Sequence, residues 1–116
     1  MSTIKVDNIR IASESVSRPV TGVAAAWSSQ QGDGTLLDGL NVTSVTNLGA
    51  GSNQINITNN FAGTAYAVVA SGTTNPNGVI PMFQTFLVGS FKLNTRNADK
   101  TSIEAATRSA CFGDLA

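Results

Sequence analysis

The stretch LNVTSVTNLGAGSNQINITNNF, residues 40–61, constrains the fold more than any other part of this sequence. Apolar and polar residues alternate on both sides of a Gly-rich centre, and the apolar positions are Leu40, Val42, Ile55 and Ile57. Successive side chains of a strand point to opposite faces, so this alternation predicts two half-buried strands joined by a turn at residues 49–52. After Val42 the next apolar residue is Val45, which predicts a β-bulge at residues 43–44.

Composition extends this pattern to the whole chain. Ser, Thr and Asn make up 36 of the 116 residues, with 11 Gly besides. These residues favour turns and the solvent faces of strands, and they weaken helix interiors. A chain of this length forms one domain, and its turn signals recur at the interval typical of all-β folds. The sequence therefore predicts an all-β antiparallel β-sandwich, jelly-roll or immunoglobulin-like, of about seven or eight strands in residues 20–116.

Further segments supply the other expected strands. VTGVAAAW (20–27) lacks a helix N-cap and is predicted to be a strand that runs into a turn, with Trp27 as a core anchor. AYAVVASG (65–72) is almost continuously apolar, which predicts a strand covered on both faces. TFLVGSFKLNTRN (85–97) is predicted to be one strand, with Phe91, Leu93 and Thr95 on one face. NADK (97–100) should form a turn, and residues 101–114 should form the closing strand, although their alanines also suit a helix.

Residues 1–19 differ from the rest of the chain and predict an extended N-terminal arm. Apolar residues alternate in two short pairs, and the phase shifts at Asp7. Pro19 prevents helix continuation. Because one strand is not stable alone, the arm needs a partner surface. We expect Lys5, Asp7 and Arg10 to set the register of this contact. The side chains predicted to make the assembly contact are Ile4, Val6, Ile9 and Ile11.

The chemistry available to the chain argues against an enzyme. There is no histidine, which removes the commonest general base and zinc ligand. The single cysteine, Cys111, has no partner for an internal disulfide and is interpreted as a small buried hydrophobe. GDGTLLDG (32–39) has only Asp33 and Asp38 as carboxylates, too few for a calcium loop, and is interpreted as a turn. No catalytic constellation and no cofactor site are expected.

Charge and hydropathy also limit the expected partners. Seven basic residues balance seven acidic ones without clustering, so no nucleic-acid partner is expected. No stretch approaches the ~20 apolar residues of a membrane span, so no membrane insertion is expected. The N-terminus lacks the apolar core of a signal peptide, which predicts synthesis in a cytoplasm.

Two kinds of residue are candidates for ligand contact. Trp27 and Tyr66 each offer a flat ring that suits a sugar, although core packing is the favoured interpretation of both. Polar loops on a rigid sandwich are the commoner place for binding. The loops at 73–78 and 96–100 therefore supply the predicted ligand-facing residues, which are Asn75, Asn77, Arg96, Asn97, Asp99 and Lys100.

Several motifs, in order, resemble those of small tail-fibre-like virion proteins of marine and cyanobacterial tailed phages. MSTIKVDNI is similar to the opening of many such proteins. Ala26-Trp27, the hairpin with Gly49 and Gly51, the return strand at 55–58, residues 65–69 and the closing ACFGD follow the order of a recurrent tail-fibre module. The chain departs from that module at SSQQGD after Trp27 and at Leu40, where a Phe is usual.

The resemblance implies a structural component of a virion, made in the host cytoplasm. Such modules are all-β and usually trimeric, and they sit in tail fibres or decorate capsids. The expected partners are therefore other copies in a homotrimer and other virion proteins of the fibre, baseplate or capsid. A carbohydrate-binding module that recognises a glycan on the host surface is the alternative.

Overall fold

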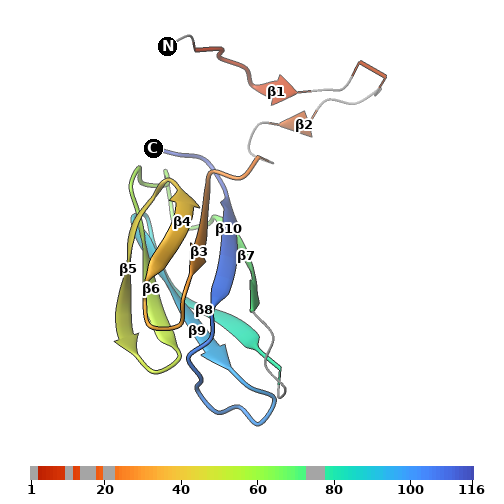
Figure 1. The fold of residues 1–116 in the computed structure, drawn as a ribbon. Helices are drawn as coiled ribbons and strands as arrows, with labels where there is room; N and C mark the ends of the chain where they lie inside the picture. The colour runs from red at the N-terminus through yellow and green to blue at the C-terminus, as the bar shows by residue number, and fades with distance from the viewer. Residues whose placement is uncertain (1–2, 10–11, 14–17, 20–22, 73–77) are drawn as a thin grey trace.

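The computed structural model describes residues 3–9, 12–13, 18–19, 23–72 and 78–116. Two four-stranded antiparallel sheets pack face to face, and the described residues contain no helix (Figure 1). The expected all-β antiparallel sandwich is confirmed, with eight strands in its two sheets. Accordingly, no helix in the described part of the chain is long and apolar enough to cross a membrane.

Each sheet contains strands from both halves of the chain. The first has the order β4-β3-β10-β7 and comprises β3 (Ala26–Gln30), β4 (Leu36–Leu40), β7 (Ala67–Gly72) and β10 (Thr107–Phe112). The second has the order β5-β6-β9-β8 and comprises β5 (Val42–Gly49), β6 (Ser52–Ile57), β8 (Ile80–Leu87) and β9 (Ser90–Arg96). The chain therefore crosses between the sheets after β4, β6, β7 and β9.

The N-terminal region carries a separate, much smaller pairing. β1 (Asn8–Ile9) pairs antiparallel with β2 (Arg18–Pro19), so the arm turns back on itself. The chain also bends at Asp7, where the phase of the apolar residues shifts. The arm lies at the same end of the sandwich as the C-terminus (Figure 1).

The core lies between the sheets and follows the predicted alternation. In β6 the side chains of Asn53, Ile55 and Ile57 are buried, and the residues between them are half-buried. In β9 the inward residues are Phe91, Leu93 and Thr95, as predicted. The single cysteine is also buried in this core, as expected.

Tyr66 organises an aromatic cluster at the centre of this core, which confirms its interpretation as a core residue. Its ring stacks on Phe61, with ring centroids 4.0 Å apart and 11° between the ring planes. Edge contacts join Tyr66 to Phe86 at 5.4 Å and to Phe91 at 6.4 Å. The Tyr66 hydroxyl donates towards the carbonyl oxygens of Leu87 at 2.7 Å and Ser90 at 3.0 Å. Burial raises the pKa of this hydroxyl to about 12.

The predicted hairpin is confirmed, and so is its bulge. β5 and β6 pair from Val42 to the turn at residues 49–52, with a register shift between Val42 and Ser44. However, Leu40 and Val42 do not belong to one strand. Leu40 ends β4 in the first sheet, whereas Val42 begins β5 in the second.

Asn41 explains this break in the strand. Its backbone has a φ of 57°, a left-handed conformation that Asn tolerates better than most residues. Its side-chain Nδ2 donates to the carbonyl oxygens of Ala25 (3.2 Å) and Asn59 (3.1 Å). Its Oδ1 accepts a hydrogen bond from the Asn59 backbone N–H at 2.7 Å. Three side-chain hydrogen bonds, to residues 16 and 18 positions away in the sequence, therefore hold the corner at which the chain changes sheets.

Three other strand predictions are wrong in part. The strand expected at residues 20–27 begins only at Ala26 and continues to Gln30, and residues 23–25 before it are not in a strand. Residues 85–97 form the end of β8 and the whole of β9 rather than one strand, because the chain turns at residues 88–89. β7 is not covered on both faces, since the outward side chain of Val69 is 57% exposed. No described part of the chain covers Val69 on the outer surface of the β4-β3-β10-β7 sheet, so the apolar run here does not mean burial on both sides.

The closing segment is a strand and not a helix. Its side chains alternate as those of a strand do, with Ala105 and Thr107 buried and Glu104 and Arg108 exposed. Regular pairing starts only at Thr107, where β10 enters the sheet between β3 and β7. The preceding residues pack against the turn at residue 32: a Cβ at Gly32 would lie 2.5 Å from the Ala105 backbone nitrogen.

Candidate binding surfaces

Trp27 lies on the outer face of the first sheet and is not a core anchor. Its side chain is 37% exposed, whereas its neighbours in β3, Ala26 and Ser28, are buried. The phase of β3 is fixed from inside by its pairing with β10. The Ser28 and Ser109 hydroxyls hydrogen-bond to each other at 2.7 Å, and Gln30 Nε2 donates to Thr107 Oγ1 at 2.7 Å. With polar pairs inside, the large indole faces outwards.

The register of the sheet places Trp27 in an apolar row that crosses all four strands. Trp27 pairs with Leu40 of β4 and Ala110 of β10, and Ala110 pairs with Val69 of β7. Leu40 is 52% exposed and Val69 is also exposed. Paired residues on neighbouring strands share a face and lie about 4.8 Å apart. We call Leu40, Trp27, Ala110 and Val69 the apolar row.

A polar row lies beside the apolar row on the same face. In register order its members are Asp38, Ser29, Arg108 and Ser71, from β4, β3, β10 and β7. Each stands two residues along its strand from the apolar row, a separation of about 6.5–7 Å. The sheet therefore presents two parallel rows of opposite character.

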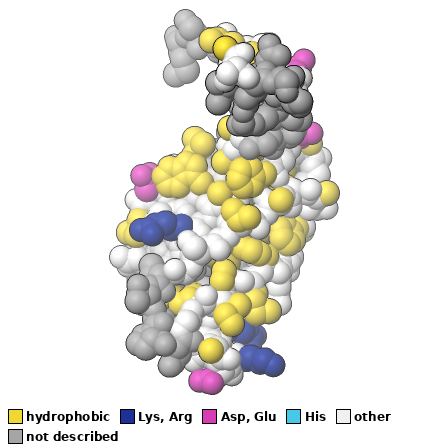
Figure 2. All heavy atoms as spheres, turned by 90° about the vertical axis from the view of Figure 1, so that its right-hand side faces the viewer, with side chains coloured by type: hydrophobic (Ala, Val, Ile, Leu, Met, Phe, Trp, Pro, Cys, Tyr) yellow, Lys and Arg dark blue, Asp and Glu magenta, His cyan; other side chains and the backbone are white. Residues whose placement is uncertain are grey.

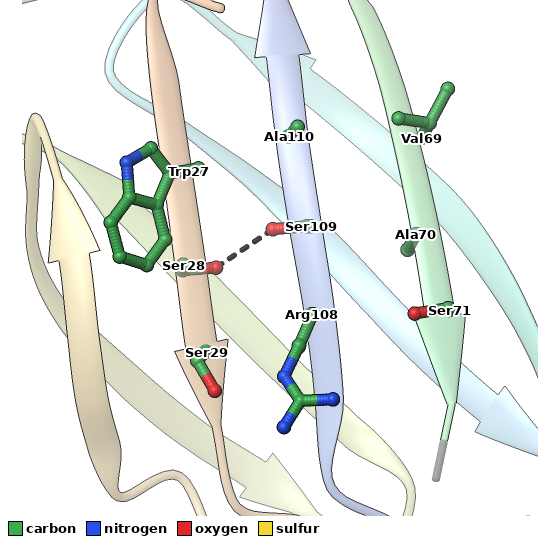
Figure 3. A pocket seen from close by; sticks show the side chains of 9 residues that line it. All are labelled: Trp27, Ser28, Ser29, Val69, Ala70, Ser71, Arg108, Ser109 and Ala110. Carbon is green, nitrogen blue, oxygen red and sulfur yellow. Dashed lines mark hydrogen bonds between the residues drawn. The ribbon is translucent and has the colours of Figure 1, made fainter.

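Trp27, Val69 and Arg108 line a shallow hollow of about 420 Å³ between these rows. Figure 3 views it from outside the sandwich, with the strands of the second sheet passing behind. The indole lies beside β3, and the guanidinium of Arg108 extends along the space between β3 and β10 towards Ser29. Among the nine residues drawn, the one hydrogen bond joins Ser28 and Ser109, so none of them pairs with the guanidinium.

The predicted ligand loop at residues 96–100 forms a second, smaller surface. Arg96, Asn97 and Lys100 line a hollow of about 300 Å³ together with Ile80 and Met82. The turn at 97–100 is confirmed, with the Lys100 N–H donating to the Asn97 carbonyl oxygen at 3.0 Å.

The polar groups of this turn are largely occupied by the turn itself. Asn97 Oδ1 accepts from the backbone N–H groups of Asp99 and Thr101, each at 3.0 Å. Arg96 Nη1 donates to the Lys100 carbonyl oxygen at 2.9 Å. Asp99 does not line the hollow. Asn75 and Asn77 lie outside the described residues, so the structure does not place them.

Of the four arm residues predicted to make the assembly contact, the structure describes the side chains of two. Ile4 is 87% exposed and Val6 is 49% exposed. The Ile9 backbone belongs to β1, but its side chain is not described, and Ile11 lies outside the described residues. Val6 and Asp7 border a hollow of about 370 Å³ with residues 23–25 and 113–115 at the end of the sandwich.

Other hydrophobic side chains reach the surface elsewhere. Figure 2 shows them spread over the side of the molecule that is at the right in Figure 1, from the arm end to the opposite end. Ile80, Met82 and Leu87 of the edge strand β8 are exposed. Their paired neighbours on β9 are polar, with Arg96 opposite Ile80 and Asn94 opposite Met82, so these residues do not belong to an apolar row across the sheet.

The reactive groups in the described residues have structural roles. No group of three His, Cys, Asp or Glu residues there is placed to hold a metal ion. The turn interpretation of residues 32–39 is confirmed for residues 32–35, where Asp33 Oδ1 accepts from the Thr35 N–H at 2.9 Å, but it is wrong for residues 36–39, which belong to β4. This hydrogen bond lowers the pKa of Asp33. Burial raises the pKa of the Cys111 thiol to about 12, which keeps it protonated and unreactive at neutral pH.

The sequence made Trp27 a candidate for sugar contact, but its favoured interpretation, a core residue, is wrong. Only the pairing of β3 with β10 reveals which face Trp27 occupies.

Comparisons with protein-family models, curated proteins and solved structures find no match to this chain.

Proposed function

We propose that this chain is a structural component of a bacteriophage particle, of the tail-fibre or fibre-like type, held in the particle through its N-terminal arm. The observation that most directly supports this proposal is the exposure of Ile4 and Val6, at 87% and 49%, on a segment outside the sandwich. The ordered resemblance of the sequence to tail-fibre modules supports the same proposal. The proposed assembly is a homotrimer that contacts other virion proteins, and capsid decoration is the alternative placement.

The energetics of the arm favour a contact with another chain. Fully burying an exposed Ile or Val side chain stabilises by about 1.5–3 kcal/mol, so Ile4 and Val6, at 87% and 49% exposure, together contribute about 2–4 kcal/mol to an interface. The paired segment of the arm, β1 with β2, has two residues on each side. An isolated pair of this length is not stable in water, so a partner surface also stabilises the backbone.

The test is a double variant of the arm, Ile4→Ser with Val6→Ser, in the full-length protein. We expect a folded sandwich by circular dichroism, but a lower oligomeric state by analytical ultracentrifugation and loss of incorporation into particles. The matched control is Leu48→Ser, which changes an exposed apolar residue at the far end of β5. Normal assembly of the arm variant, or equal loss in the control, would show that the arm does not hold the chain. Electron microscopy of labelled particles then separates tail fibre from capsid.

A further inference from the structure

We infer that the outer face of the β4-β3-β10-β7 sheet is a saccharide-binding platform, with a sugar ring on Trp27 and its hydroxyl groups on Arg108 and the polar row. This inference does not depend on the proposed function, because it rests on side chains of the sheet face and on none of the arm.

The first support is the setting of the single tryptophan. A sugar ring has one face made mainly of C–H groups, which packs against flat aromatic surfaces. Trp27 is partly exposed at the surface hollow of about 420 Å³, and Val69 extends the apolar wall across β7. Large exposed aromatic side chains are uncommon on the unpartnered face of a sheet and often mark recognition sites.

The second support is the chemistry of the polar row. Sugar hydroxyls both donate and accept hydrogen bonds. Arg108 supplies only donors, Asp38 supplies acceptors, and the hydroxyls of Ser29 and Ser71 supply both. Arg108 and Ser29 line the hollow, and Asp38 continues the row on β4. Among the residues drawn in Figure 3, none hydrogen-bonds to the Arg108 guanidinium, which faces the hollow.

The third support is the spacing of the rows. A ring stacked on Trp27 has its edge hydroxyls about one row away, because the two rows are about 6.5–7 Å apart along the strands. The strands hold this spacing rigidly, which lowers the conformational cost of binding. One cation and one carboxylate in the row give no net positive field, which argues against a nucleic-acid ligand.

The single tryptophan makes the test direct, because all tryptophan fluorescence of the protein comes from position 27. The full-length protein is titrated with a panel of neutral and uronic-acid-containing oligosaccharides. We expect at least one to change the fluorescence saturably, and calorimetry to give its Kd. Acidic oligosaccharides that bind in preference to neutral ones would identify a carboxylate as the partner of Arg108.

Variants then assign the site. Trp27→Ala and Arg108→Ala should each weaken binding by about tenfold or more, measured by calorimetry, whereas Trp27→Phe should retain part of the affinity. Arg96→Ala is the control, since it removes a half-buried arginine at the 96–100 turn, away from the platform. We expect its effect to stay within about twofold.

Three outcomes would overturn the inference. One is the absence of binding across the panel. Another is binding that Arg96→Ala abolishes and Trp27→Ala leaves intact, which would move the site to the 96–100 turn. The third is a Trp27→Ala protein that loses its oligomeric state and keeps its saccharide affinity, which would make this face a contact between copies. The arm variants change no residue of the apolar or polar row, so failure of the proposed function is distinguishable from failure here.

Discussion

Replacing Tyr66 with Phe tests the central packing of the sandwich, because it removes one oxygen atom and keeps the ring. The lost hydroxyl donates towards the carbonyl oxygens of Leu87 and Ser90, which flank the turn between β8 and β9. Leaving a buried acceptor without its donor costs about 1–3 kcal/mol. We therefore expect Tyr66→Phe to lower the free energy of unfolding by about that amount, measured by urea denaturation at pH 7.

The same substitution has a second effect at high pH. Burial raises the pKa of Tyr66 from its ordinary value of 10.0 to about 12. The unfolded chain therefore releases this proton first, and ionisation favours unfolding. The stability linked to Tyr66 is complete below pH 10 and is lost as the pH rises to about 12, by up to about 1.4 kcal/mol per pH unit. Tyr66→Phe removes this part of the alkaline loss.

The assay is unambiguous because the chain has one tyrosine. Absorbance of the tyrosinate reports its ionisation in the folded protein, and urea unfolding at several pH values reports the linked stability. Cys111 is the necessary control: burial raises its pKa from 9.0 to about 12, so it adds its own alkaline loss that Cys111→Ala removes. A tyrosinate midpoint near 10 in the folded protein, or an unchanged alkaline slope in Tyr66→Phe, would refute this account.

Three further substitutions test local features of the fold, each by urea denaturation. Gly51→Ala should destabilise by about 1–3 kcal/mol or more, because φ is +71° there and a Cβ would lie 2.7 Å from the Thr95 carbonyl oxygen. Gly63→Ala, with open space around it, should be neutral, and equal effects would disprove the steric argument. Asn41→Ala should lower the free energy of unfolding by about 2–4 kcal/mol, because it removes the hydrogen bonds of the corner. Asn41→Gly should lose about 1 kcal/mol less, because Gly adopts the positive φ without strain. Equal losses would exclude backbone strain at this corner. Ser28→Ala alone should lower the free energy of unfolding by about 1–3 kcal/mol, because it leaves the buried Ser109 hydroxyl without a partner. The double variant Ser28→Ala, Ser109→Ala should lose less than the two single losses added together. Additive losses would argue against that hydrogen bond.

Much of the fold could be predicted because local physics fixes it. Alternation in β6 and β9 specifies their buried faces, since a strand with one apolar face has one stable orientation against a core. The turns at residues 49–52 and 97–100 follow from Gly, Asn and Asp, whose short side chains and backbone freedom act over a few residues. The bulge after Val42 also follows from a shift in phase that is visible in the sequence.

What only the tertiary structure decided is how distant strands meet. In the sequence, Asn41 looks like one polar residue of an alternating strand. In the structure, its hydrogen bonds to Ala25 and Asn59 hold the corner between the two sheets. Trp27 was a core residue by its hydrophobicity, but the hydrogen bonds from β3 to β10, about 80 residues apart in the chain, turn the polar side of β3 inwards. Hydrophobicity is a property of one residue, whereas the face that a strand presents depends on the register with its partners. The sequence therefore determined the strands, and the pairing of β3 with β10 decided that the indole of Trp27 and the guanidinium of Arg108 share one exposed surface.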